Sequence, residues 1–82
     1  MKFVVLSVYD EKACFYDRPI CCKTDAEGIR MFSAAVQDAG SNIGMFPSDY
    51  SLYRIGRFSD ESGSLEPEVP VFLSRGSEHV KV

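Results

Sequence analysis

The three cysteines and the single histidine of this chain could in principle supply four ligands to a metal ion: Cys14, Cys21, Cys22 and His79. Structural zinc sites use short paired spacings such as C-x2-C, which the chain lacks. Adjacent cysteines on a strand point to opposite faces, so Cys21 and Cys22 cannot easily reach one ion. We therefore expect one buried and one exposed thiol in this pair, and neither a metal nor another cofactor.

The sequence also shows no recognisable set of residues for nucleophilic or acid–base catalysis. No Ser or Cys has an evident His partner, since the single histidine lies near the C-terminal end. No carboxylates are paired at a spacing typical of acid–base work, and no glycine-rich phosphate loop is present. We expect a protein that is not an enzyme, although residues distant in sequence could still assemble a site.

One segment has the residue types of a nucleic-acid contact. Residues 53–58, YRIGRF, interleave aromatic side chains with arginines. Aromatic residues on a sheet stack on bases, and nearby arginines pair with phosphates. The alternative, which the residues alone favour, is that Tyr53, Ile55 and Phe58 belong to the core while the arginines are solvated.

The elements that position these residues begin with a strand over residues 2–9, KFVVLSVY. Val4, Leu6 and Val8 would point to one face, and Phe3, Val5, Ser7 and Tyr9 to the other. Both faces are largely apolar, and one helix covers only one of them. The second face therefore meets another element or another subunit, and a dimer is favoured. The self-association candidates are Phe3, Val5 and Tyr9.

A helix follows a polar connection over residues 10–18 and a short strand over residues 19–23. Thr24 and Glu27 form a capping box, and an apolar stripe at helical spacing continues to about residue 39. Gly40 is the expected helix stop. Residues 41–49 are predicted to be an irregular connection pinned to the core.

The last predicted elements are a strand over residues 50–58 and a short edge strand over residues 69–73. Gly56 within the first of these indicates a bulge or a close backbone approach. We expect an α+β fold: a small antiparallel sheet of three or four strands, ββαβ(β), with one helix packed across one face. The predicted domain spans residues 1–73, with residues 74–82 as a C-terminal tail.

Charge and composition narrow the function classes. The net charge is −3, and all of it arises in residues 59–82, which hold two basic and five acidic residues. The balanced remainder lacks the usual electrostatic signature of nucleic-acid binding. An odd cysteine count without a signal peptide favours a reducing compartment, and the opening apolar run is about a third of a membrane span.

The chain resembles the small nonstructural protein of gokushovirus-type microviruses, which are bacterial viruses with single-stranded DNA. The resemblance spans residues 1 to about 65. It is carried by Val8-Tyr9-Asp10, Lys12-Ala13, Tyr16, Pro19-Ile20, Asp25-Ala26, Ile29-Arg30, Phe32, Val36, residues 52–58 (LYRIGRF), Asp60 and Gly63. Family members usually have the acidic residue directly after the aromatic residue, whereas Ser59 intervenes here.

The resemblance implies a role in viral single-stranded DNA synthesis or packaging in the host bacterial cytoplasm, with binding to single-stranded DNA as the leading hypothesis. The alternatives are an adaptor that docks on a viral or host replication or packaging protein without touching DNA, and a purely structural, capsid-associated role. No family motif assigns the binding residues. The candidates that the sequence supplies for nucleic-acid binding are Tyr9, Lys12, Arg18, Arg54, Arg57 and Phe58.

Overall fold

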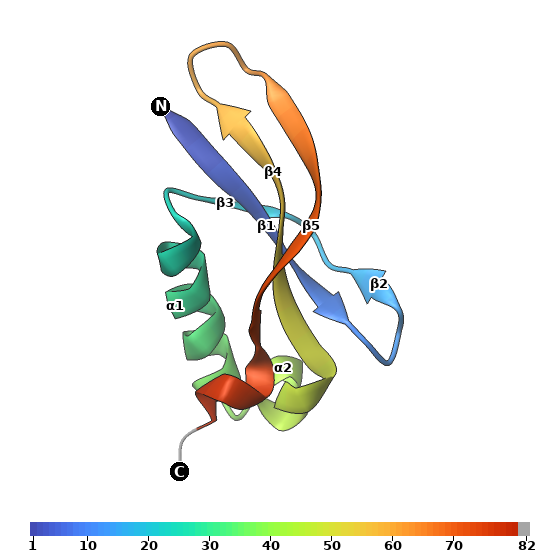
Figure 1. Cartoon of the computed structure of the whole chain (residues 1–82). Coiled ribbons are helices and arrows are strands. Elements are labelled where there is room, and N and C mark those ends of the chain that lie inside the picture. The colour runs from blue at the N-terminus through green and yellow to red at the C-terminus, as the bar shows by residue number, and fades with distance from the viewer. Residues whose placement is uncertain (81–82) are drawn as a thin grey trace.

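Figure 1 shows the computed structural model of the chain, which describes residues 1–80: a five-stranded antiparallel sheet with one main helix alongside it. The elements are β1 Lys2–Asp10, β2 Phe15–Tyr16, β3 Ile20–Cys22, α1 Asp25–Gln37, α2 Asn42–Met45, β4 Tyr50–Ser59 and β5 Leu65–Arg75. Short 3-10 helices, η1 at Pro47–Asp49 and η2 at Gly76–His79, complete the chain. The expected α+β fold with a helix across one face is confirmed, with more strands than expected.

The strand that was not expected is β2, which precedes β3 and, like β3, pairs with β1. β2 and β3 both pair with the same side of β1, while β4 pairs with its other side and β5 forms the far edge. Asp17 and the two residues after it form a break between β2 and β3. The backbone N–H of Asp17 still donates to the carbonyl of Val8 at 2.8 Å, so this break stays attached to β1.

α1 begins as its sequence predicts and ends earlier. The Thr24 hydroxyl accepts from the backbone N–H of Glu27 at 3.1 Å, and the Glu27 carboxylate accepts from the N–H of Lys23 at 3.2 Å. The last helical residue is Gln37, and Asp38 adopts an extended backbone, so Gly40 is not the helix stop that we expected.

The core lies between α1 and one face of the sheet. Its buried members are Val4, Leu6, Cys22, Phe32, Val36 and Leu52, and Ile43 of α2 packs against them. Cys22 is buried and Cys21 is exposed, as the alternation of side chains along a strand predicts. Among residues 1–80, no helix is long and apolar enough to cross a membrane.

The C-terminal region differs from the predicted tail. β5 extends to Arg75, and Ser74 is only 3% exposed. The His79 ring meets Phe32 of α1 edge to face at 5.8 Å, and its Nε2 lies 2.5 Å from the Ser74 hydroxyl. Residues 74–79 therefore belong to the fold, because the His79 ring packs on Phe32 at the edge of the core. Residues 81–82 lie outside the described part of the chain.

Candidate nucleic-acid interface

Four aromatic rings lie together on the side of the sheet that faces away from α1. Tyr9 and Tyr16 have ring centroids 4.7 Å apart, and Tyr53 lies 6.1 Å from Tyr9 and 5.7 Å from Tyr16. Phe72 extends the row, with its centroid 5.8 Å from that of Tyr53. The rings meet at steep angles, which is a favourable arrangement for aromatic pairs.

Strand register places these rings on one side. Tyr9 stands opposite Tyr16, and Tyr53 stands opposite Phe72, so each pair shares a face. Tyr53 is also opposite Ser7, which points away from the core. We call this side the open face and define it by Phe3, Val5, Ser7, Tyr9, Tyr16, Tyr53, Phe58 and Phe72.

Beyond the four rings, the open face has an apolar hollow and a second aromatic pair. The hollow has a volume of about 220 Å³ and is lined mainly by Val5, Pro19, Ile55 and Leu65. Phe3 and Phe58 pack with ring centroids 6.4 Å apart. The open face is therefore apolar along its length, and no helix in the described residues packs on it.

The segment between β2 and β3 covers part of the open face. The Ser7 hydroxyl donates to the carbonyl of Asp17 at 2.6 Å and is 1% exposed, and Val5 is 6% exposed beside Pro19. Among the self-association candidates, Val5 therefore offers little surface, whereas Phe3 and Tyr9 are half-buried. Burial raises the pKa of the Tyr9 phenol, with Cys14 adding to the shift.

The two candidate arginines of β4 lie on the face opposite the aromatic rings. Arg54 Nη1 donates to Asp25 at 2.5 Å and its Nε to Glu68 at 2.8 Å, and the Arg54 side chain is 17% exposed. Arg57 Nε lies 3.4 Å from the same Glu68 carboxylate. The structure thus separates both arginines from Tyr53 and engages them in ion pairs that join β4, β5 and α1.

Two other candidate cations remain exposed at the side where β2 and β3 flank β1. Lys12 lies in the turn between Tyr9 and Tyr16 and has no ion pair within the described chain. Arg18 has a side chain that is 97% exposed, with only the neighbouring Asp17 near it, at 4.0 Å. Both cations are therefore exposed in the segments that flank β2, the strand that carries Tyr16.

The model of the phage ORF5 protein family matches residues 3–79. The chain belongs to this phage protein family. The searches of curated proteins and of solved structures found no match to this chain.

Sequence reasoning on this phage ORF5 protein missed three members of the open face as binding residues. Tyr53 lies in the segment with the residue types of a nucleic-acid contact, but a place in the core was the alternative favoured for it. Tyr16 falls in the predicted polar connection and Phe72 in the predicted short edge strand. Tyr9 and Tyr16 do flank a short turn, so hairpin pairing could have placed them opposite each other. For Phe72 the chain holds no comparable signal, because bulges in the β4–β5 pairing set its register.

Proposed function

We propose that this phage protein binds single-stranded DNA through the open face and acts in viral DNA synthesis or packaging without catalysing a reaction. The finer viral assignment that goes with this proposal is a gokushovirus-type microvirus, on the sequence resemblance above. The observation that carries the proposal is the row of four aromatic rings, Tyr9, Tyr16, Tyr53 and Phe72, on a sheet face that no helix of residues 1–80 covers.

Exposure of the rings supports base stacking. Tyr16 is 43% and Phe72 49% exposed, so both present ring surface to a ligand. Stacking of a base on an aromatic side chain contributes about 1–3 kcal/mol and tolerates any base, because every base has a π face. The site therefore fits unpaired bases better than a duplex, whose bases are already stacked.

Electrostatics set the expected strength of binding. The protein carries a net charge of −3, and both β4 arginines are held by carboxylates. Lys12 and Arg18 are exposed cations in the segments that flank β2, the strand of Tyr16. Each phosphate that they neutralise contributes about −0.7 to the slope of log K against log salt. We expect weak, stacking-dominated binding with a shallow salt dependence.

The test is fluorescence anisotropy of a labelled oligothymidylate at several salt concentrations, with two variants in β2. Tyr16→Ala removes a ring from the open face, whereas Phe15→Ala removes the adjacent ring, which points to the opposite face. Tyr16→Ala should weaken binding about tenfold, the effect expected for one stacked base. Phe15→Ala should leave the affinity unchanged. Equal effects of the two variants, or no binding at low salt, would contradict the proposal.

We further propose that the protein self-associates, with a dimer favoured. Apolar side chains along β5 are exposed, with Leu65 at 65% and Val69 at 85%. A second copy would cover this edge and double the cations offered to DNA. Light scattering at several concentrations tests this, and a strict monomer throughout the range would contradict it.

The adaptor alternative has its own supporting observation. The ion pairs of Arg54 and Arg57 leave few cations for phosphates, which suits a protein that meets another protein rather than DNA. A pull-down from infected cells that recovers a viral or host replication protein after nuclease treatment would favour the adaptor. A pull-down that nuclease abolishes would favour DNA binding.

A further inference from the structure

A groove runs along the other side of the sheet, where α1 and α2 leave part of β1 uncovered. It consists of two adjoining pockets that share Val8 and Ile43. One pocket, of about 210 Å³, is apolar and is lined mainly by Ile20, Met31 and Ala35. The other, of about 290 Å³, has a mixed lining in which polar side chains stand beside Val8, Phe15 and Ile43. The groove therefore offers an apolar end and a polar end to one ligand.

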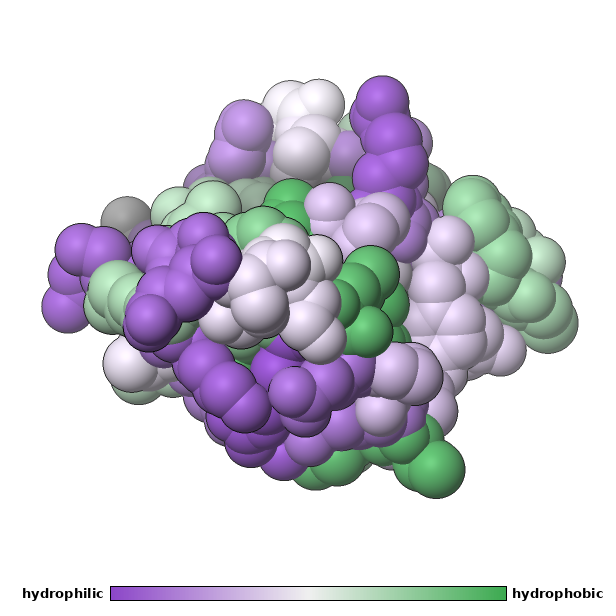
Figure 2. All heavy atoms as spheres, turned by 90° about the horizontal axis from the view of Figure 1, so that it is seen from above, coloured by the Kyte–Doolittle hydropathy of each residue, from purple (hydrophilic) through white to green (hydrophobic). Residues whose placement is uncertain are grey.

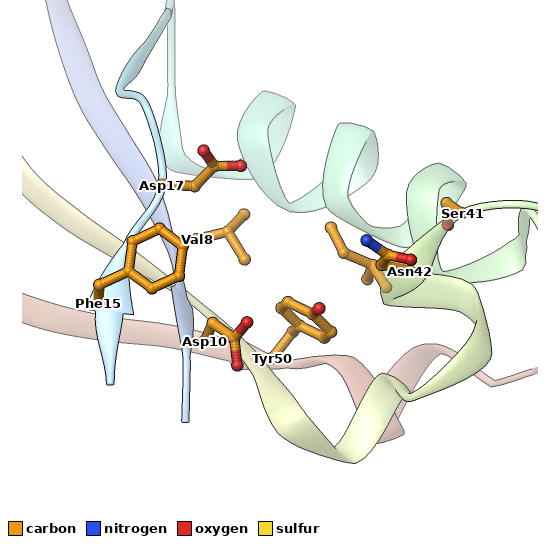
Figure 3. Close-up of a pocket in the computed structure, with 8 residues that line it drawn as sticks. Val8, Asp10, Phe15, Asp17, Ser41, Asn42 and Tyr50 are labelled. Atoms are coloured by element: carbon orange, nitrogen blue, oxygen red, sulfur yellow. The ribbon is translucent and has the colours of Figure 1, made fainter. Parts of the chain in front are cut away.

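Figure 3 shows the polar end, where side chains from β1, the β2–β3 connection, α2 and β4 surround one hollow. Asp10 and Asp17 supply carboxylates, Tyr50 a phenol and Asn42 an amide, and the Phe15 ring stands at the edge. Burial raises the pKa of the Tyr50 phenol, with the charge of Asp10 adding to the shift. This phenol is therefore a neutral hydrogen-bonding group.

The polar end has negative charge without a matching cation inside it. Asp10 forms no ion pair within the described residues, and its Oδ1 accepts from the backbone N–H groups of Lys12 and Ala13. Asp17 is 64% exposed and its Oδ1 accepts from the backbone N–H of Arg18 at 2.8 Å. The Arg18 side chain, 4.0 Å from this carboxylate, is 97% exposed. Two carboxylates in a partly apolar hollow favour a cationic ligand and repel phosphate.

We propose that this groove binds a partner protein through an exposed peptide segment in which a lysine or arginine follows an aliphatic residue. The aliphatic side chain would occupy the pocket between Ile20 and Met31, where it buries apolar surface. The cationic side chain would reach Asp10 and Asp17, and the Phe15 ring would contribute a cation–π contact. Carboxylates and phenol together supply acceptors for several N–H donors.

The position of the groove separates this interaction from DNA binding. Tyr16 lies on the open face and its neighbour Phe15 at the groove, on opposite sides of β2. A peptide and an oligonucleotide could therefore occupy one protomer together. The groove proposal stands independently of the proposed function, because no residue of the four-ring row lines the groove.

The test is an NMR titration of the ¹⁵N-labelled full chain with N-acetyl-leucyl-arginine amide at millimolar concentrations. The expected result is saturable shifts of amide resonances around the groove, with those of the open face unchanged. Two control peptides replace arginine by citrulline, which removes the charge, or leucine by serine, which removes the apolar side chain. Each control should bind at least about fivefold more weakly, since each loses one half of the recognition.

Variants of the protein test the carboxylates directly. The double variant Asp10→Asn, Asp17→Asn removes both charges and keeps the oxygen that caps the turn after β1. The matched control, Asp60→Asn, Glu61→Gln, removes two charges in the β4–β5 turn, at the opposite end of the sheet (Figure 1). The first should raise the peptide Kd about tenfold and the second should leave it unchanged.

Three results would overturn the groove proposal. The first is the absence of saturable shifts with the arginine peptide in the wild-type protein. The second is equal binding of the citrulline peptide, which would leave only apolar contact. The third is an equal loss in both double variants, which would show that net charge alone attracts the peptide. Circular dichroism spectra and melting curves confirm that each variant is folded.

Discussion

At the scale of single residues, Arg54 shows how a sequence pattern and its structural role diverge. The alternation of aromatic and basic residues in β4 is real, but the sheet sends the two types to opposite faces. Arg54 then lies beside Asp25 of α1 and Glu68 of β5. A period of two would place Arg57 on the face of Tyr53, but the bulge between Arg54 and Gly56 moves Arg57 to the face of Arg54. The two carboxylates beside Arg54 come from distant parts of the chain, so the sequence could not pair them with it.

These ion pairs predict a pH dependence of stability. The hydrogen bond from Arg54 lowers the pKa of Glu68 below its ordinary value of 4.5. A carboxylate with a lowered folded-state pKa stabilises the fold above its unfolded pKa, and the contribution is lost as pH falls through the folded pKa. Glu68→Gln should therefore be less stable than wild type at pH 7, with a difference that shrinks below pH 4.5.

Urea denaturation between pH 7 and pH 3 measures this difference. Glu61→Gln is the control, because the Glu61 side chain is 84% exposed and its ion pair with the N-terminal amine, at 3.1 Å, lies at the surface. The control should follow the wild-type stability closely at every pH. A Glu68→Gln variant that tracks the control would show that the Arg54 pair does not stabilise the fold.

At the scale of elements, α1 and β4 were predictable, and β5 was not. Thr24 and Glu27 specify the start of α1 through local hydrogen bonds, and Gly56 marks a close approach of two strands. β5 runs from Leu65 to Arg75 despite two prolines, because a strand at the edge of a sheet tolerates them. Pairing with β4 decides its length, and that pairing is not a property of its own residues.

Gly56 gives a prediction at this scale. A Cβ atom there would lie 2.6 Å from the carbonyl oxygen of Glu66, a backbone atom in β5. Gly56→Ala should therefore force β4 and β5 apart and lower the free energy of unfolding by about 2 kcal/mol. Gly40→Ala is the control, since its nearest neighbour is 3.4 Å away, and it should change stability by less than about 0.5 kcal/mol.

Thermal or urea unfolding followed by circular dichroism measures both variants. If Gly56→Ala is as stable as Gly40→Ala, the close β4–β5 approach at this glycine is absent in solution.

At the scale of the whole molecule, the sheet separates two surfaces of different character. The open face has the row of aromatic rings, whereas the opposite face has α1, the core and the acidic groove. Figure 2, which looks down on the end with the β4–β5 turn, shows hydrophilic and hydrophobic residues interspersed there. This end is therefore a less obvious ligand surface than the two faces of the sheet.

The two apolar faces of β1 were predictable from its alternation, and so was the need for cover on the second. How that face is occupied was not predictable. The backbone between β2 and β3 covers Val5 and Ser7, and the remaining surface is formed by rings from four strands. Contacts between strands far apart in sequence create this surface, so no local sequence pattern predicts it.

The most direct test of the central claim is ¹⁹F NMR of protein labelled with 3-fluorotyrosine, titrated with oligothymidylate. The chain has four tyrosines: Tyr9, Tyr16 and Tyr53 on the open face, and Tyr50 at the groove. Base stacking on the open face should shift the first three resonances and leave that of Tyr50 in place. A shift of Tyr50 alone, or four unchanged resonances at saturating oligonucleotide, would contradict DNA binding at the open face.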